Sequence, residues 1–268
     1  MDRNELKSKI ARALTVALPI LLVAILAMLI VVAMNMSKEN SVPVLGGGVG
    51  STTTTTTTSG DGGGVTDDPA PDPSSKGLSF LSHGDGTCSL LGLGECDDGF
   101  IIIPCASPDG DIVVEIADNA FKNCSSIRGV EICDTIERVG AYAFYGSTIR
   151  EIVIPKNVEE IGNYAFSGCK YLEKIEVDVD NRNYSSLSGV LYNKPQSTLI
   201  TYPAGKTENF VNISVDVTKI ANMAFYRASY VKKVNYHGTK ASWGMVEIGA
   251  GNDVIDEAIL YCAGDNGK

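Results

Sequence analysis

A nine-residue phrase of apolar and polar positions returns four times along the chain. Each copy has apolar residues at its first and fourth positions and ends in Ala-Phe. The copies lie at 113–121, 136–144, 158–166 and 217–225, so successive copies begin 23, 22 and 59 residues apart. Self-similarity at a period of roughly 20 to 50 residues is typical of stacked repeat architectures. The pattern therefore predicts a solenoid, with an insertion in the longest interval.

A second phrase lies between the copies, and its apolar residues alternate with other residues. Such alternation is typical of a β-strand that buries one face. The inward positions are Ile127, Val130, Ile132, Ile149, Ile152, Ile154, Leu172, Ile175, Val177, Val231, Val234 and Tyr236. Four residues at equivalent positions point to the other face of the strand. These outward residues are Glu131, Val153, Glu176 and Asn235.

A single repeat of about 22 residues cannot bury its own apolar face, so neighbouring repeats stack and share a core. Stacking makes equivalent strands parallel. We expect Phe121, Phe144, Phe166 and Phe225, the last residues of the four phrases, to form an aromatic spine in that core.

The phrases closely resemble the BspA-like leucine-rich repeats of surface proteins from bacteria and some protists. Residues 152–172, IVIPKNVEEIGNYAFSGCKYL, follow the family pattern in full, and IIIP at 101–104 marks an earlier partial repeat. The resemblance spans about Leu78 to Cys262. It implies a β-rich leucine-rich-repeat solenoid of short parallel strands, turns and short helical segments. It also implies adhesion or recognition of host and matrix proteins.

The repeat domain is expected over 78–268, with a cap at each end. Residues 178–216 interrupt the period, and within them the runs GVLY and TLITYP flank the turn-rich NKPQS. We interpret this stretch as a β-hairpin at about 188–203. A C-terminal cap is expected at about 237–262, where a short helix around Trp243 closes the stack.

The N-terminal part predicts a membrane anchor. Residues 13–34 contain no charged side chain and are long enough to cross a bilayer as an uncleaved transmembrane helix. Arg3, Lys7, Lys9 and Arg12 precede this span, so residues 1–12 are expected in the cytoplasm and the repeat domain outside the cell. Residues 35–77 are rich in Thr, Gly and Pro, which predicts a disordered linker.

Charge and motif content exclude several function classes. The chain has 22 Lys and Arg against 32 Asp and Glu, a net charge of −10, which disfavours nucleic acid as a partner. Its two histidines, His83 and His237, are far apart in sequence, and no nucleophile motif accompanies them. The sequence predicts no enzyme and no cofactor.

Metal binding is also not predicted. The string Asp178 to Asn183 superficially resembles a calcium loop, but Gly189 stands where an EF-hand needs its closing Glu. Its polar side chains are expected to cap turns, and a weak calcium site stays an alternative.

Seven cysteines cannot all pair within the chain. The neighbours Cys88, Cys96 and Cys105 could include one disulfide, whereas Cys124 and Cys169 share a repeat position and are expected to be buried. Cys133 replaces the proline found as Pro104 and Pro155, and we interpret that change as drift between repeats.

The leading hypothesis is a membrane-anchored cell-surface protein that binds an extracellular or envelope protein or glycan through the outward strand face. A non-catalytic structural or spacer module of the cell envelope is the alternative. The candidate contacts share an outward position on the strand ladder, although polar residues are expected there even without a ligand. They are Glu131, Glu151, Val153, Lys174, Glu176, Lys233 and Asn235.

Overall fold

The computed structural model of the chain describes residues 74–265, which lie within one compact unit that begins at Asp68. The predicted cytoplasmic segment 1–12, transmembrane helix 13–34 and linker up to residue 73 lie outside the described residues. Within residues 74–265, none of the helices combines the length and apolar character that crossing a membrane requires.

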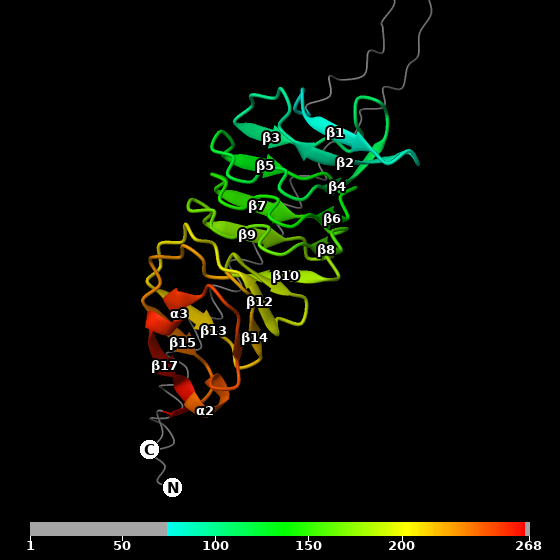
Figure 1. Cartoon of the computed structure of the whole chain (residues 1–268). Helices are drawn as coiled ribbons and strands as arrows, with labels where there is room; N and C mark the ends of the chain where they lie inside the picture. Colours follow the sequence, from blue (N-terminus) through cyan, green and yellow to red (C-terminus); the bar gives the residue numbers. More distant parts are fainter. Residues whose placement is uncertain (1–73, 266–268) are drawn as a thin grey trace, which may run out of the picture. The chain divides into compact units, whose positions relative to one another are not determined.

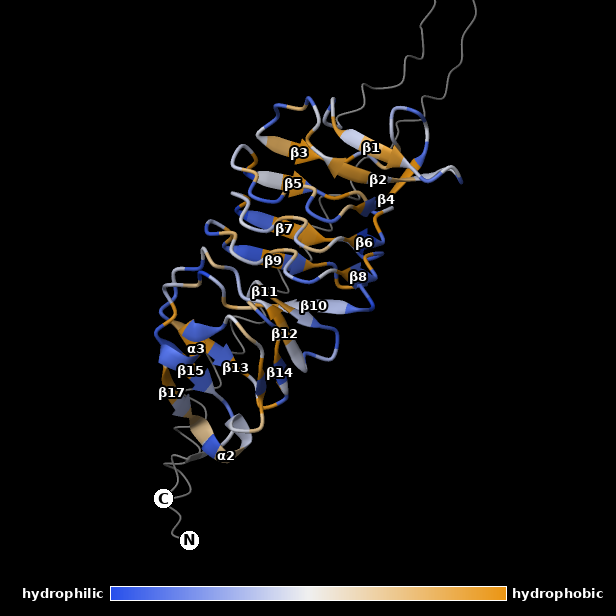
Figure 2. Cartoon of the chain, viewed as in Figure 1, coloured by the Kyte–Doolittle hydropathy of each residue, from blue (hydrophilic) through white to orange (hydrophobic). Residues whose placement is uncertain are grey.

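From β2 to β9, successive strands alternate between two sheets, which form the N-terminal part of a solenoid (Figure 1). The first sheet is four-stranded and parallel throughout. Its strands, in spatial order, are β3 (Phe100–Ile102), β5 (Gly129–Glu131), β7 (Glu151–Ile154) and β9 (Lys174–Val177). Figure 2 shows both hydrophilic and hydrophobic stretches in β7 and β9, as expected of strands with one buried face.

The second sheet runs through the nine-residue phrases. Its strands are β1 (Ser79–Ser82), β2 (Thr87–Gly92), β4 (Ile112–Ile116), β6 (Arg138–Val139) and β8 (Glu160–Ile161). β1 pairs antiparallel with β2, and the remaining pairs are parallel. The antiparallel hairpin is the predicted N-terminal cap. The packed repeat domain begins before residue 78, because Ser75 is buried and its backbone N–H donates to the carbonyl of Ile102. The predicted linker 35–77 is therefore too long at its C-terminal end.

The C-terminal half repeats this two-sheet plan. One sheet contains β10 (Tyr184–Leu187), β11 (Val190–Asn193), β12 (Thr198–Thr201), β14 (Lys219–Ile220) and β16 (Glu247–Ile248). The other contains β13 (Phe210–Ile213), β15 (Lys233–Tyr236) and β17 (Ile259–Cys262). The interval 178–216 therefore holds regular repeat strands, β12 and β13, as well as an insertion.

The predicted hairpin at 188–203 is present as β11 and β12, which pair antiparallel. It belongs to a longer meander, because β10 also pairs with β11. β12 then pairs parallel with β14 and so continues the ladder. Val190, Leu191 and Tyr192 of β11 are all buried. This hairpin is therefore part of the interior and not a surface insertion.

The core forms two clusters instead of one continuous interior. The first runs from Leu78 to Ile175 and includes Leu191, and the second runs from Val190 to Ile255. Neighbouring residues of β11 thus belong to different clusters, which places this strand where the two meet.

The aromatic spine is confirmed with one correction. All four phenylalanines are at most 1% exposed. Phe121 stacks on Phe144 with ring centroids 5.2 Å apart, and Phe144 stacks on Phe166 at 5.5 Å. Phe225 stacks on Tyr202 at 4.9 Å. The inserted meander therefore brings its own aromatic residue to the second part of the spine.

The C-terminal cap contains more than the predicted helix. α2 (Lys240–Trp243) is that helix, and Trp243 packs edge-on against Tyr236. A further layer follows, formed by β16, α3 (Asp253–Glu257), β17 and the 3-10 turn η1 (Ala263–Asp265). All helices of residues 74–265 lie in this cap, so the repeats themselves are joined by turns and not by the expected helical segments.

Two cysteine predictions need correction. The disulfide joins Cys105 to Cys133, which lies outside the predicted trio, so the replacement of proline by Cys133 creates a cross-link between successive strands of the first sheet. Cys169 is fully buried, but Cys124 at the equivalent position is partly exposed. Ser126 Oγ lies 3.3 Å from the Cys124 sulfur.

Candidate functional site

The outward side chains of β3, β5, β7 and β9 form a surface that we call the rung face. Strand register sets their neighbours: Glu151 lies opposite Lys174, and Val153 lies opposite Glu176. On the N-terminal side, Val130 pairs with Ile152, which brings Glu131 beside Val153. The five predicted contacts on this sheet are therefore brought together by the ladder.

Two exposed apolar side chains lie on the rung face. Val153 is 54% exposed, and Phe100 on the edge strand β3 is 55% exposed. Phe100 lies across Gly129, where an added Cβ would stand 2.7 Å from the ring. Glycine is thus required there for the ring to lie flat over the neighbouring strand. A groove of about 490 Å³ runs over these strands.

Carboxylates lie around these two apolar side chains. Five acidic residues but only one lysine line the groove: Glu131, Asp134, Glu151, Glu176, Asp178 and Lys174. Lys174 Nζ lies 2.9 Å from Glu176 and 3.9 Å from Glu151. The hydrogen bond and charge of Glu176, with a smaller effect of Glu151, raise the pKa of Lys174. Lys156, outside the lining, pairs with Asp134 at 3.1 Å. Both lysines are therefore paired cations, and the five carboxylates still leave the groove with an excess of negative charge.

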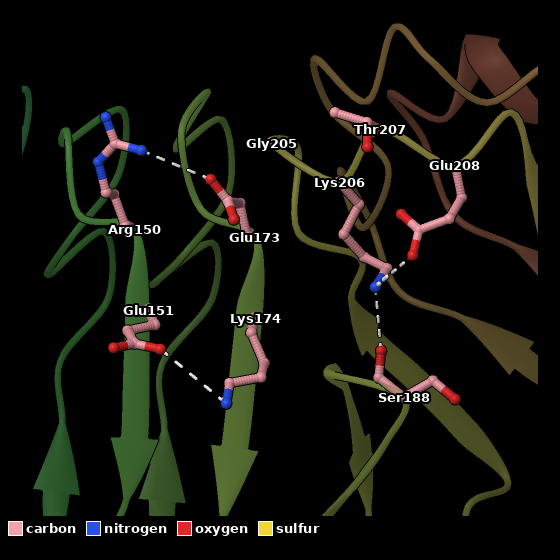
Figure 3. A pocket seen from close by; sticks show the side chains of 9 residues that line it. All are labelled: Arg150, Glu151, Glu173, Lys174, Ser188, Gly205, Lys206, Thr207 and Glu208. Atoms are coloured by element: carbon pink, nitrogen blue, oxygen red, sulfur yellow. Dashed lines mark hydrogen bonds and ion pairs between the residues drawn. The ribbon is translucent and has the colours of Figure 1, made fainter.

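A second, polar pocket of about 600 Å³ opens beside the rung face, between β9 and the segment 205–208 (Figure 3). It shares Glu151 and Lys174 with the groove, so the two hollows are contiguous. Its lining is Arg150, Glu151, Glu173, Lys174, Ser188, Gly205, Lys206, Thr207 and Glu208. The backbone N–H of Gly205 donates to the carbonyl of Leu172, which fixes the far wall against the preceding repeat.

Every charge in this pocket has a partner, as the dashed lines of Figure 3 show in part. Arg150 lies 3.6 Å from Glu173, and Lys206 lies 3.3 Å from Glu208. Lys206 Nζ also donates to the carbonyl oxygen of Ser188 at 3.1 Å. A hydrogen bond from its own backbone N–H lowers the pKa of Glu208, and the charge of Lys206 lowers it further. Glu208 is thus held ionised, which does not suit a proton donor near neutral pH.

The other two predicted contacts lie on a different sheet. Lys233 and Asn235 belong to β15, in the sheet β13-β15-β17. Asn235 Nδ2 donates to Asn212 Oδ1 at 3.1 Å, and Lys233 Nζ lies 6.0 Å from the Tyr261 ring centroid. The structure therefore divides the seven candidates into a group of five on the rung face and a pair on the second ladder.

Sequence reasoning missed several lining residues. Phe100 precedes the run IIIP and could have been found by extending the strand alternation one step back. Lys206, Thr207 and Glu208 carry no such signal, because they reach the pocket through the folding of an irregular segment onto another repeat.

Other sequence candidates have structural roles. Asn181 in the calcium-like string is fully buried, and its side chain makes four hydrogen bonds to backbone groups, which confirms turn capping. His83 contacts Thr87 Oγ1 and Ser89 Oγ, each at 2.8 Å, within the N-terminal cap. Among residues 74–265, no three His, Cys, Asp or Glu side chains are grouped as metal ligands.

Comparison with known proteins gives one family match. Residues 108–208 match the BspA type leucine rich repeat region in six copies. The matched range is shorter than the predicted Leu78 to Cys262. Among curated proteins, none matches.

Solved structures that are similar to this chain include leucine-rich repeat proteins. A leucine rich cell surface protein from Faecalibacterium prausnitzii is 19% identical, with 66% of this chain and 72% of that chain covered and a TM-score of 0.43. A leucine-rich repeat protein from Eubacterium ventriosum is 19% identical over 65% and 66% of the chains, at a TM-score of 0.35. The pneumococcal vaccine antigen PcpA is 17% identical over 65% and 64%, at a TM-score of 0.33.

Proposed function

We propose that this chain, whose residues 108–208 match the BspA type leucine rich repeat region, is a non-catalytic binding protein displayed at the cell surface. Its ligand is a protein segment that carries both apolar and positively charged side chains, and this segment docks on the rung face. The observation that carries the proposal is a groove on one regular sheet in which two exposed apolar side chains, Phe100 and Val153, lie among carboxylates.

Burial of the two exposed apolar side chains, Phe100 and Val153, supplies the favourable free energy of docking. Phe100 and Val153 are each about half exposed, so a ligand that covers them removes apolar area from water. Full burial of such a side chain is worth about 1.5–3 kcal/mol, so covering the exposed half of each contributes about 1 kcal/mol. With a few further contacts along the groove, the free energy of binding reaches that of a transient interaction.

The carboxylates of the groove favour a positively charged ligand. One lysine among five carboxylates leaves the groove negative, which attracts lysine and arginine side chains and repels acidic segments. Charge complementarity of this kind raises the association rate and falls with ionic strength, since the Debye length is about 8 Å at physiological salt. The polar pocket, with its charges already paired, then orients the hydrogen-bonding groups of the same segment.

Display follows from the N-terminal sequence. We propose that residues 13–34 anchor the chain in the membrane with residues 1–12 in the cytoplasm, and that the linker gives the repeat domain reach. A protease added to intact cells is then expected to remove the repeat domain and leave a tag placed within residues 1–12 intact.

Selection from a random peptide library tests the binding proposal. The bait is the full chain in a mild detergent, and the probe is a library of random 12-residue peptides displayed on phage. We expect the selected peptides to be enriched in lysine or arginine together with aliphatic or aromatic residues. Their affinity should fall at least tenfold for Val153→Asp and for the double variant Glu131→Lys, Glu176→Lys.

Val215→Asp is the matched control, because Val215 is 52% exposed but lies in a turn away from β7. Peptides without basic enrichment would contradict the proposal. So would equal losses for Val153→Asp and Val215→Asp. If the chain is instead a spacer module without a ligand, we expect no peptide to be enriched.

A further inference from the structure

A second surface lies on the turns that follow β4, β6, β8 and β14. Four tyrosines and two cations from these turns contact one another, and we call this set the tyrosine stripe. It consists of Lys122, Tyr142, Tyr145, Tyr164, Tyr226 and Arg227. None of these residues belongs to the rung face or to the polar pocket.

The four rings form a continuous row. Tyr164 lies 5.0 Å from Tyr142, and Tyr142 lies 5.5 Å from Tyr145, measured between ring centroids. Tyr226 stacks on Tyr145 at 6.1 Å, although 81 residues separate them in sequence. Tyr226 also packs over Gly168, where an added Cβ would stand 3.0 Å from the ring. The row therefore connects the two halves of the repeat domain.

The backbone under two of these tyrosines is unusual. Tyr142 and Tyr164 have φ of 56° and 63°, the left-handed region that bulky side chains rarely adopt. The preceding repeat has Asn119 at the same position with φ 63°, a residue that tolerates this conformation. The fourth phrase has Met223 at this position with φ 55°, so the turn accepts different side chains and does not itself require a tyrosine.

The cations give the stripe its charge. Lys122 Nζ lies 4.7 Å from the Tyr142 centroid and 5.9 Å from the Tyr145 centroid, and the Arg227 guanidinium lies 5.5 Å from the Tyr226 centroid. Neither cation forms an ion pair with a carboxylate of residues 74–265. Arg138, in the neighbouring sheet, is instead paired with Glu115 and Asp118. The stripe is a locally positive surface on a chain of net charge −10.

We propose that the tyrosine stripe binds an acidic oligosaccharide. The half-buried rings, two of which lie beside Lys122 and Arg227, offer apolar area and hydroxyl groups that complement the C–H groups and hydroxyls of sugar rings. Lys122 and Arg227 pair with the carboxylates of uronic acid units. A neutral glycan would use only the rings, and a simple polyanion would use only the cations.

Binding of defined oligosaccharides to the full chain in mild detergent tests this site. The probes are a fluorescent hyaluronate octasaccharide, a neutral chito-oligosaccharide of matched length, and dextran sulfate. We expect saturable hyaluronate binding that is at least tenfold tighter than binding of the neutral probe. Stronger binding of dextran sulfate, unaffected by removal of the rings, would overturn the proposal in favour of simple charge attraction.

The variant pair Tyr142→Asn, Tyr164→Asn removes two rings and introduces the residue that Asn119 shows to be compatible with the turn. We expect at least a tenfold loss of hyaluronate affinity with an unchanged circular dichroism spectrum. Tyr142→Phe, Tyr164→Phe keeps the rings and should retain binding within about twofold. Lys122→Gln, an exposed substitution, should lose several-fold affinity even if the asparagine variant is unstable.

Tyr261→Asn is the control, since Tyr261 is also an exposed tyrosine near a lysine but lies on β17. A loss of hyaluronate affinity for Tyr261→Asn equal to that of the stripe variants would overturn the proposal, as would no saturable binding. Peptide binding at the rung face is measured in parallel, so failure of one site is distinguishable from failure of the other.

Discussion

Asn181 holds the turn after β9 with both ends of its side-chain amide. Nδ2 donates to the carbonyls of Pro155 and Val158 in the preceding repeat, and Oδ1 accepts from the backbone N–H groups of Asn183 and Tyr184. A fully buried amide that satisfies four backbone groups links two repeats more specifically than apolar packing does.

Asn181→Ala is therefore expected to lower the free energy of unfolding by about 3 kcal/mol or more, because buried backbone groups lose their partners. Urea denaturation measures the change. Asn157→Ala is the control, since Asn157 makes one exposed hydrogen bond to the Asp134 carbonyl and should change stability by less than about 1 kcal/mol. Equal effects would show that burial of Asn181 does not matter.

Cys169 is a second residue whose environment dictates its chemistry. Burial raises the pKa of its thiol from 9.0 to about 11. The sulfur donates a hydrogen bond to the carbonyl of Phe144 at 2.9 Å, so the neutral thiol is the form that the fold accommodates.

The raised pKa predicts a loss of stability in alkali. Below pH 9 the thiol is protonated in both states, and between pH 9 and 11 only the unfolded chain releases the proton. The free energy of unfolding should fall in that window by up to about 1.4 kcal/mol per pH unit for this group. Cys169→Ala should have a shallower slope than the wild type from pH 9 to 11 in urea titrations, and an unchanged slope would refute the assignment. Cys124, which is partly exposed, should react with a thiol reagent at pH 8 while Cys169 does not.

At the residue scale, the sequence predicted what periodicity controls. The inward isoleucines and the four spine phenylalanines are buried because their spacing follows the repeat. Cys133 was misinterpreted, because pairing with Cys105 depends on two strands meeting in space and leaves no trace in local spacing.

At the scale of elements, the Cys105–Cys133 disulfide staples β3 to β5. The Cα atoms of the two cysteines are 5.4 Å apart, and the cysteines are 28 positions apart in sequence. β3 is an edge strand that forms part of the rung face, so the cross-link lies just beyond the C-terminal ends of two rung-face strands.

Removal of this cross-link by Cys105→Ser, Cys133→Ser should lower the free energy of unfolding by about 3 kcal/mol, as expected for a loop of this length. Chemical denaturation with and without reductant measures it. Cys124→Ser, outside the disulfide, should change stability by no more than about 0.5 kcal/mol. A reductant effect that persists in the double variant would contradict the role of this bond.

The sequence predicted some elements better than others. Strands β5, β7, β9 and β15 were found because they alternate over at least three positions. The two-residue strands within the nine-residue phrases are too short for any period to reveal. The C-terminal layer was missed because α3 replaces the Ala-Phe turn there.

At the scale of the whole molecule, the repeat plan continues through an interruption by changing what fills the core. β11 belongs to the place where the two clusters meet, and Tyr202 takes the position of a spine phenylalanine beside Phe225. Stacked repeats tolerate this because each layer needs only a fit to its neighbours. The same irregular segment builds the polar pocket next to the rung face, a feature that no repeat pattern encodes.

Site-specific photocrosslinking in the full chain on intact cells tests the central claim, that the rung face contacts a protein ligand. Benzoylphenylalanine is placed at Val153 or at Val215, two similarly exposed valines. We predict a discrete crosslinked protein from position 153, lost in the Glu131→Lys, Glu176→Lys background, and none from position 215. The same crosslinks from both positions, or none from position 153, would contradict the account.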